Sequence, residues 1–277
     1  MNRYQKLKLM AADIRKLTIR AMAASGQGHI GGAMSICDLL AVLYGRVMNV
    51  DPQDPHKPDR DWLVLSKGHC GPALIATLAY KGYFDVSELN KLNANGTKYP
   101  NHCDRLKTPG IDITTGSLGQ GLSLASGVAF AHRMAKMENY VYAIIGDGEL
   151  QEGQNWEAFQ FIAHHKLNHL VVLVDNNKRQ LDGYVSDICN QNDLNMKFTS
   201  FGFAVQSIDG HDVEAIEQAI VKAKNLEKPS VIVLNTEKGH GCSFAEIPGF
   251  NHYMVITKEM AENACAEIDR RVKEELL

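Results

Sequence analysis

Two short polar segments carry the residues best suited to chemistry. Gly146-Asp147-Gly148 offers a carboxylate, and Asp175-Asn176-Asn177 offers an amide oxygen from Asn177. These are hard oxygen ligands of the kind that Mg²⁺ uses together with phosphate oxygens. The glycines beside Asp147 also allow the backbone to approach a phosphate closely. A lone Gly-Asp-Gly is equally typical of a tight turn, so the functional interpretation depends on the second segment, thirty residues further along.

Histidines are the second group of candidates. The candidates are four of the eleven, each preceded by glycine or asparagine in an expected loop: His29, His69, His102 and His252. Such imidazoles can hydrogen-bond a sugar hydroxyl, hold a diphosphate or transfer protons near neutral pH. A zinc site is the competing interpretation, but the sequence has no HExxH motif and no CxxC pair. Four others are expected in surface or packing positions: His132, His164, His165 and His169.

The elements that must position these groups are two buried strands and a helix. The short apolar runs Val141–Ile145 and Leu170–Val174 are typical of parallel strands, and Gln154–Lys166 between them is typical of a crossover helix. Ligands of open parallel sheets bind outside the carboxyl ends of the strands. We therefore expect the two polar segments to lie together at one edge of a sheet.

Strands and helices alternate along the rest of the chain. This alternation predicts an α/β fold with a doubly wound, mostly parallel sheet and helices on both faces, formed as one domain over residues 1–277. Gly26, Gly28 and Gly31 match a dinucleotide-binding spacing, but they follow a helix, which argues against that function. We expect Ser35 to cap a helix reaching Met48. Further strands are expected at 62–66, 203–208 and 230–235, and further helices at 7–24, 71–80, 86–95, 121–137, 193–200, 212–226 and 257–277.

Composition excludes several classes of protein. The 277 residues are 45% hydrophobic with a net charge of −3, and no basic stretch suggests nucleic acid binding. Residues 1–20 are too charged for a signal peptide, and no apolar run is expected to span a membrane. The six cysteines form no CxxC pair, which predicts reduced thiols in a cytoplasmic protein.

The segment Gly-Asp-Gly, followed after about thirty residues by Asn-Asn, resembles the thiamine-diphosphate motif. Together with the histidine loops, the motifs resemble those of transketolase over nearly the whole chain. The length matches only the amino-terminal, diphosphate-binding part of that family, which some bacteria and archaea encode as a separate chain. The matching stretches are Gly28–Gly32, Ser66–His69, His102, Thr115–Gly121, Gly146–Gly153 and Asp175–Lys178.

The resemblance implies how thiamine diphosphate would be held. Asp147, the side chain of Asn177 and the main-chain carbonyl of Arg179 would bind Mg²⁺ or Ca²⁺, which bridges the two phosphates. Residues expected near the cofactor are His69, Gly116, Leu118, Gly146, Gly148, Glu149, Leu181 and His252, with His69, Gly148 and His252 at the diphosphate.

The resemblance also implies catalytic roles. His29, His69 and His102 would face the hydroxyl and carbonyl oxygens of a sugar phosphate and relay protons. Glu152 would join a carboxylate network across a subunit interface, although an early-turn carboxylate can also cap the helix that begins near Gln154. The loop around His102 reads Asn101-His102-Cys103, where the family commonly has Gly-His-Pro. Ile30 follows His29, where the family commonly has a proline. The chemistry of carbon–carbon bond exchange belongs to the cofactor, and the protein orients it.

The expected partner is a carboxyl-terminal subunit carrying the pyrimidine domain, in an α2β2 heterotetramer. That domain supplies the glutamate that activates the cofactor, so we expect the isolated chain to be inactive. The reaction would transfer a two-carbon ketol unit from a ketose to an aldose in carbohydrate metabolism, such as the pentose phosphate route. Alternatives are a transketolase for a sulfo-sugar or branched sugar, the α subunit of a 2-oxo acid dehydrogenase, and a non-catalytic protein that keeps the fold.

Overall fold

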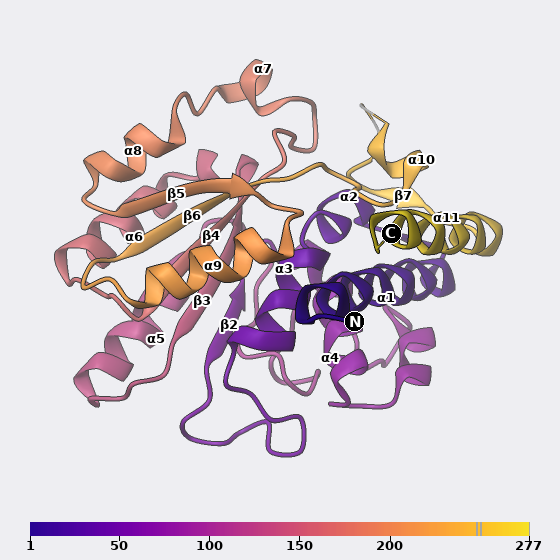
Figure 1. The fold of residues 1–277 in the computed structure, drawn as a ribbon, viewed down its shortest axis with the longest axis horizontal. Coiled ribbons are helices and arrows are strands. Elements are labelled where there is room, and N and C mark those ends of the chain that lie inside the picture. Colours follow the sequence, from indigo (N-terminus) through magenta and orange to yellow (C-terminus); the bar gives the residue numbers. More distant parts are fainter. Residues whose placement is uncertain (248, 250, 277) are drawn as a thin grey trace.

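The computed structural model describes residues 1–247, 249 and 251–276. Its main sheet has five parallel strands in the order β2-β3-β4-β6-β5, as expected for an α/β fold (Figure 1). The expected strands are confirmed to within a residue or two: β2 (Trp62–Leu65), β3 (Val141–Gly146), β4 (Leu170–Asn176), β5 (Ala204–Asp209) and β6 (Ser230–Asn235). A second, two-stranded antiparallel sheet pairs β1 (Gln27–Gly28) with β7 (Met254–Val255), which the sequence analysis did not predict.

Helices cover both faces of the main sheet. Alternate residues of each central strand enter two separate hydrophobic cores, as the two-residue period of a strand requires. In β3, Tyr142 and Ile144 face one core, whereas Ala143 and Ile145 face the other. The first core includes α1 (Arg3–Ser25), α3 (Cys37–Val42), α4 (Gly71–Lys81), α9 (Val213–Lys224) and part of α11 (Lys258–Leu276); the second includes α5 (Gln120–Met134), α6 (Gly153–His164) and α8 (Leu194–Ser200).

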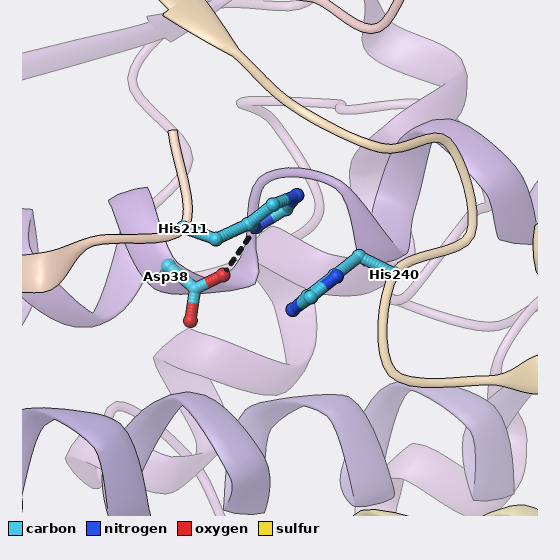
Figure 2. A group of neighbouring side chains, drawn as sticks. All are labelled: Asp38, His211 and His240. Carbon is cyan, nitrogen blue, oxygen red and sulfur yellow. Dashed lines mark hydrogen bonds and ion pairs between the residues drawn. The ribbon is translucent and has the colours of Figure 1, made fainter. Parts of the chain in front are cut away.

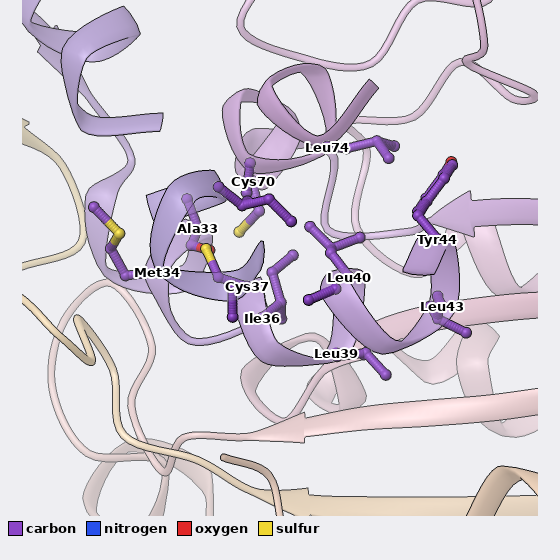
Figure 3. Packing of buried hydrophobic residues seen from close by; sticks show 14 of the residues in the cluster. Ala33, Met34, Ile36, Cys37, Leu39, Leu40, Leu43, Tyr44, Cys70 and Leu74 are labelled. Atoms are coloured by element: carbon purple, nitrogen blue, oxygen red, sulfur yellow. The ribbon is translucent and has the colours of Figure 1, made fainter. Parts of the chain in front are cut away.

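The segment after α1 differs from the expected single helix over 35–48. It forms α2 (Ile30–Met34), α3 and the π-helical turn η1 (Leu43–Val47), packed as a buried unit (Figure 3). The predicted cap at Ser35 is wrong, because its hydroxyl lies 2.7 Å from Asp175 Oδ2 and 3.0 Å from Gly32 O, and these are the acceptors for its proton. Asp38, three residues further along, pairs with Arg15 of α1. The side chains of Ser35 and Asp38 therefore bond to residues far away in sequence.

The same segment corrects the expectation that no apolar run approaches membrane-spanning length. Within the described residues, Ile30–Val47 is long and apolar enough to meet that criterion. However, 83% of this window is buried inside the protein, and it is divided among three helical pieces. Its apolar side chains therefore belong to the hydrophobic core of the protein.

Short elements complete the chain, and several were not expected. The C-terminal ends of α1 and α4 were correctly placed, since Gly26 and Gly82 adopt the left-handed conformation that ends a helix there. Asp212 caps α9, accepting from Glu214 N and Ala215 N. The remaining short helices are η2 (Gly68–Cys70), η3 (Val86–Lys91), η4 (Gly148–Gln151), α7 (Val185–Cys189) and α10 (Ser243–Glu246).

Candidate functional site

The two polar segments lie at adjacent strand ends, as expected. Gly146 at the end of β3 is in register with Asp175 near the end of β4, and Asp147 N donates to Asp175 O (3.1 Å). We call Asp147, Gly148, Asn177 and Arg179 the strand-end corner. The parallel pairing of two buried strands is what brings together residues thirty positions apart.

Asp147 is a buried carboxylate bonded to backbone amides. It accepts from Gly148 N (2.8 Å) and from Lys178 N. Burial raises the pKa of Asp147 to about 7, and the nearby Asp175 carboxylate adds to the increase. A divalent cation beside this carboxylate would reverse the shift by favouring the ionised form.

The amide of Asn177 has a fixed orientation. Its Nδ2 donates to Asp175 Oδ2 (2.8 Å), and its Oδ1 accepts from Arg179 N (3.1 Å). A carbonyl oxygen has two lone pairs, so Oδ1 can still serve as a metal ligand. The Arg179 guanidinium lies over the ring of Tyr184, 5.2 Å from its centroid, so this side chain has a structural contact of its own.

Asp175 organises the floor of the site. Its carboxylate is fully buried and pairs with the equally buried ammonium of Lys67. It also accepts from Ser35 Oγ, Thr236 Oγ1 and Asn177 Nδ2. Burial alone would raise the pKa of Asp175, but Lys67 and the hydrogen bonds hold it below its usual range. The carboxylate is thus saturated by protein groups, and it holds Asn177 in position.

The four loop histidines form one cluster. The ring of His29 lies 5.2 Å from that of His69, 5.7 Å from that of His102 and 5.3 Å from that of His252. His69 and His252 are 5.1 Å apart. We call these four residues the histidine cluster. They come from the start of α2, η2 and two irregular segments, so only the tertiary structure brings them together.

The histidine cluster is held in its neutral form. Burial lowers the pKa of His29 to about 4 and that of His252 to about 3, with smaller contributions from His102 and Lys238 respectively. Burial also lowers the pKa of His102, and it lowers that of His69 well below its usual range. Neutral imidazoles can each donate and accept a hydrogen bond, which suits them to sugar hydroxyls and to proton transfer.

Lys238 joins the histidine cluster to Gln180, the residue that follows Arg179 of the strand-end corner, and sequence reasoning missed it. Its Nζ donates to His252 Nδ1 (3.1 Å) and to Gln180 O (3.1 Å). Burial lowers the pKa of Lys238 to about 8. The residue follows the carboxyl end of β6, the strand next to β4, so the rule that identified Asp147 and Asn177 could have found it. Asn101, whose Nδ2 lies 3.0 Å from His29 Nδ1, was also missed as a contact of the cluster.

Glu149 has a different environment from the other expected cofactor residues. Its buried carboxylate accepts from Gly119 N (2.9 Å), Gly146 N (3.0 Å) and the Ser66 hydroxyl. These bonds join the ends of β2 and β3 to the loop before α5. Glu149 thus positions the loop that contains Gly119 and the strand end at Gly146.

Other expected site residues are accessible in the isolated chain. Leu181 is 61% exposed, Glu152 and Gly116 are exposed, and Leu118 is half-buried. Glu152 occupies the N-cap position of α6, beside the helix start as expected, but its side chain makes no capping hydrogen bond to the described residues. A Cβ on Gly116 would lie 3.3 Å from the ring of His102, which places this backbone against the histidine cluster.

The residues fit a diphosphate with a divalent cation. The strand-end corner offers an acid whose hydrogen bonds within the described chain come from backbone amides, together with an oriented amide oxygen. Lys238 offers a buried ammonium within reach of the same corner through Gln180. At Gly148, a Cβ would lie 2.9 Å from the Cβ of Gln180, so glycine keeps this backbone close-packed. Charged, hydrogen-bonding and backbone groups thus converge on one region.

Comparison with known proteins shows which proteins this chain is similar to. Residues 6–254 match the family model described as transketolase, thiamine diphosphate binding domain. A 6-deoxy-6-sulfo-D-fructose transketolase subunit of Clostridium sp. (strain MSTE9) is 51% identical, over 95% of this chain and 96% of its own length. A subunit of apulose-4-phosphate transketolase from Actinobacillus succinogenes is 36% identical, over 96% of each chain.

Solved structures and longer relatives agree. A transketolase from Campylobacter jejuni superposes with a TM-score of 0.89 at 32% identity, over 97% of this chain and 43% of that one. Human transketolase is 36% identical over 97% of this chain, which spans 43% of the human protein. The chain therefore corresponds to less than half of the single-chain enzymes, but to nearly the full length of separately encoded subunits.

Proposed function

Since the chain belongs to the transketolase family, as the amino-terminal subunit of a two-chain thiamine-diphosphate enzyme, we propose that its strand-end corner holds the cofactor through a divalent cation. The enzyme transfers a two-carbon ketol unit from a ketose to an aldose and requires a partner subunit. The convergence of Asp147, Asn177 and the histidine cluster at one sheet edge carries this proposal.

The cation is Mg²⁺ or Ca²⁺, held by Asp147, Asn177 Oδ1 and the carbonyl of Arg179. The buried Asp147 carboxylate supports this assignment, because burial without a cationic partner is unfavourable for the ionised form. Gly148, His69, His252 and Lys238 bind the diphosphate oxygens. Gly146 and Glu149 shape the corner from behind, Glu149 through its bonds to backbone amides.

The histidine cluster acts on the substrate. Thiamine diphosphate, when bound, supplies the carbon nucleophile and electron sink for carbon–carbon exchange. His29, His69 and His102 donate hydrogen bonds to hydroxyl and carbonyl oxygens of the sugar and move protons at their ring nitrogens. Their neutral state supports the hydrogen-bonding role, since a neutral imidazole has one N–H that donates and one ring nitrogen that accepts. Gly116, Leu118 and Leu181 contact the rings of the cofactor.

The partner is a carboxyl-terminal subunit with a pyrimidine domain, in an α2β2 heterotetramer. The exposure of Leu181 and Glu152 supports an interface beside the site, because an apolar cofactor contact needs a cover. Glu152 joins a carboxylate network across that interface. The free cysteines support a cytoplasmic location.

For the donor, we propose a sulfonated ketose of the 6-deoxy-6-sulfo-D-fructose type. The support is the relative with that activity, which is 51% identical, compared with 36% and 33% for two subunits of apulose-4-phosphate transketolases. Removing two carbons from a six-carbon sulfo-ketose leaves a four-carbon sulfo-aldose. The groups that bind the sulfonate are expected mainly on the partner subunit.

The test is co-expression with the neighbouring reading frame, followed by assays with thiamine diphosphate and Mg²⁺. We expect turnover with 6-deoxy-6-sulfo-D-fructose at a kcat/KM at least about ten times that with fructose 6-phosphate or apulose 4-phosphate. A preference for either phosphate would overturn the substrate assignment while leaving the transketolase assignment intact. Turnover by this chain alone would contradict the need for a partner.

A further inference from the structure

A second cluster of histidines lies beside a groove of about 990 Å³, outside the candidate site. It contains His211, from the turn after β5, and His240, from the loop after β6, next to Asp38 of α3 (Figure 2). The two imidazole rings stack, with centroids 3.6 Å apart. Asp38 is buried, and Arg15 of α1 pairs with both of its carboxylate oxygens.

Both ring nitrogens of His211 are used. Nδ1 lies 2.8 Å from Asp38 Oδ2, and Nε2 accepts from the backbone N–H of Glu237 (2.9 Å). An accepting Nε2 carries no proton, so Nδ1 must be the protonated nitrogen and donates to Asp38. Arg15 Nε also donates to His240 O (3.2 Å). We call Arg15, Asp38 and His211 the Asp38 clamp.

This geometry argues against a metal site, even though Asp38, His211 and His240 offer ligand atoms within 4.8 Å of one another. A cation bound through His211 would displace either the Asp38 bond or the Glu237 bond. It would also share the Asp38 carboxylate with the Arg15 guanidinium, a fixed positive charge. What the cluster binds is the backbone N–H of Glu237, through His211 Nε2.

The backbone that it binds leads directly to the candidate site. Glu237 is followed by Lys238, whose ammonium reaches His252 and Gln180. On the other side, Gly239 N donates to Gly31 O (2.9 Å) and Asn251 Nδ2 donates to Lys238 O (3.2 Å). The Lys238 side chain is closely packed, since a Cβ on Gly31 would lie 2.8 Å from its Cγ.

We propose that His211, oriented by Asp38 and Arg15, is a positioning residue that sets the Glu237–Lys238 backbone and so aims the Lys238 ammonium at the cofactor's diphosphate. His211 touches neither cofactor nor substrate and acts through Glu237. This inference rests on the proposed diphosphate role of Lys238. The imidazole of His211 has one fixed tautomer, and its unprotonated Nε2 accepts a hydrogen bond from one backbone amide.

The experiment measures thiamine-diphosphate affinity of the two-chain complex at saturating Mg²⁺, by calorimetry. H211N keeps a donor near Nδ1 for Asp38 but removes the acceptor for Glu237 N–H, and we expect affinity to fall about five- to tenfold, as for the loss of one net hydrogen bond. H211Q places an oxygen near Nε2, and we expect it to restore affinity to within about twofold of wild type. The matched control is H132N, which removes another buried imidazole, beside Trp62.

A double-mutant cycle separates positioning from general destabilisation. K238M alone should weaken cofactor binding, and adding H211N to K238M should cause less than about a twofold further loss, because the two residues act through one ammonium. Full additivity would overturn the inference. An unchanged affinity in K238M would instead refute the proposed role of Lys238, so the two failures are distinguishable.

The wild-type chain offers a test that does not depend on variant folding. Nitrogen NMR of His211 should show the Nδ1–H tautomer, and the Glu237 amide, which donates to His211 Nε2, should exchange slowly. An Nε2–H tautomer, or a Glu237 amide that exchanges as fast as a solvent-exposed one, would contradict the clamp.

Discussion

The strand-end corner and the Asp38 clamp each contain a buried carboxylate and an arginine, but the two carboxylates have opposite surroundings. Asp38 is matched by Arg15 and His211, and although burial works to raise its pKa, these two partners hold it well below its usual range. Within the described chain, Asp147 accepts hydrogen bonds from backbone amides alone, and burial raises its pKa to about 7.

The difference teaches how to separate binding groups from structural ones in this fold. In the clamp, both nitrogens of His211 are bonded to protein atoms. In the histidine cluster, His29 and His252 each have one side-chain hydrogen-bond partner among the described residues, at Nδ1, and their rings approach one another instead. Unmet charge and accessible ring nitrogens mark the place where a ligand completes the electrostatics.

The largest expected effect comes from Asp147→Asn, which keeps the shape of the side chain but removes its charge. Cofactor affinity of the two-chain complex should fall more than about 1,000-fold, because a charged metal ligand is lost. The free chain should become more stable at pH 8, since an unfavourable buried charge is gone. Calorimetry and urea denaturation measure the two effects. Unchanged affinity would refute the metal assignment.

Arg15→Met should break the clamp itself. It leaves the Asp38 carboxylate buried beside an apolar side chain, and the unfolding free energy should drop by about 3–5 kcal/mol. The matched control is Arg20→Met on the same helix, where the pair with Glu262 is exposed; its cost should stay below about 0.5 kcal/mol. Equal costs for the two variants in urea denaturation would show that Asp38 is not compensated by Arg15.

His102→Ala tests the histidine cluster. Turnover by the two-chain enzyme should fall about 100-fold, the lower end of what a positioned acid–base group contributes, while cofactor affinity stays near normal. His56→Ala, an exposed loop histidine, should leave both quantities unchanged. Steady-state kinetics and calorimetry decide the outcome. A large loss of cofactor affinity with normal turnover would count against a substrate role for His102.

The smallest effect concerns the pH dependence of stability in the chain without cofactor. His69 has a lowered pKa in the folded state, so below about pH 6.5 the unfolded chain takes up a proton that the folded chain does not. Stability should therefore fall as pH decreases from about 6.5 to 4.5. Asp147 acts in the opposite direction: its raised pKa lowers stability as pH increases from about 4 to 7.

His69→Gln isolates the histidine contribution. The variant should lose about 1 kcal/mol per pH unit of this slope relative to wild type, measured as urea midpoints between pH 4.5 and 6.5. His164→Gln, an exposed histidine of α6, should leave the slope unchanged. An unaltered slope in His69→Gln would mean that His69 is as easily protonated in the folded chain as in the unfolded one.

Much of the fold could be predicted because local patterns and tertiary structure agree. The runs that form β3 and β4 are apolar and β-branched, and a strand buried on both faces needs that composition. The segment 35–48 could not be predicted well. Ser35 and Asp38 look like capping residues locally, but their partners are Asp175 and Arg15, which lie far away in sequence. Long-range hydrogen bonds overrode local propensity there.

The candidate site shows a similar division. Asp147, Asn177 and the four clustered histidines were all proposed from the sequence, because their motifs have fixed spacing around strand ends and loops. Lys238 was not, since a lysine in a glycine-containing loop resembles a solvated surface charge. Its role emerges only from its burial and its contacts with His252 and Gln180.

The sequence by itself determined which residues are available for chemistry: a Gly-Asp-Gly and an Asn-Asn placed at neighbouring strand ends, with histidine loops around them, offer oxygen and nitrogen groups that suit a diphosphate cofactor. Only the tertiary structure decided which buried polar groups are already satisfied. His211 meets Asp38 across 173 positions, and Ser35 meets Asp175 across 140. The physical reason is that saturation depends on hydrogen-bond partners, and packing of distant elements chooses those partners.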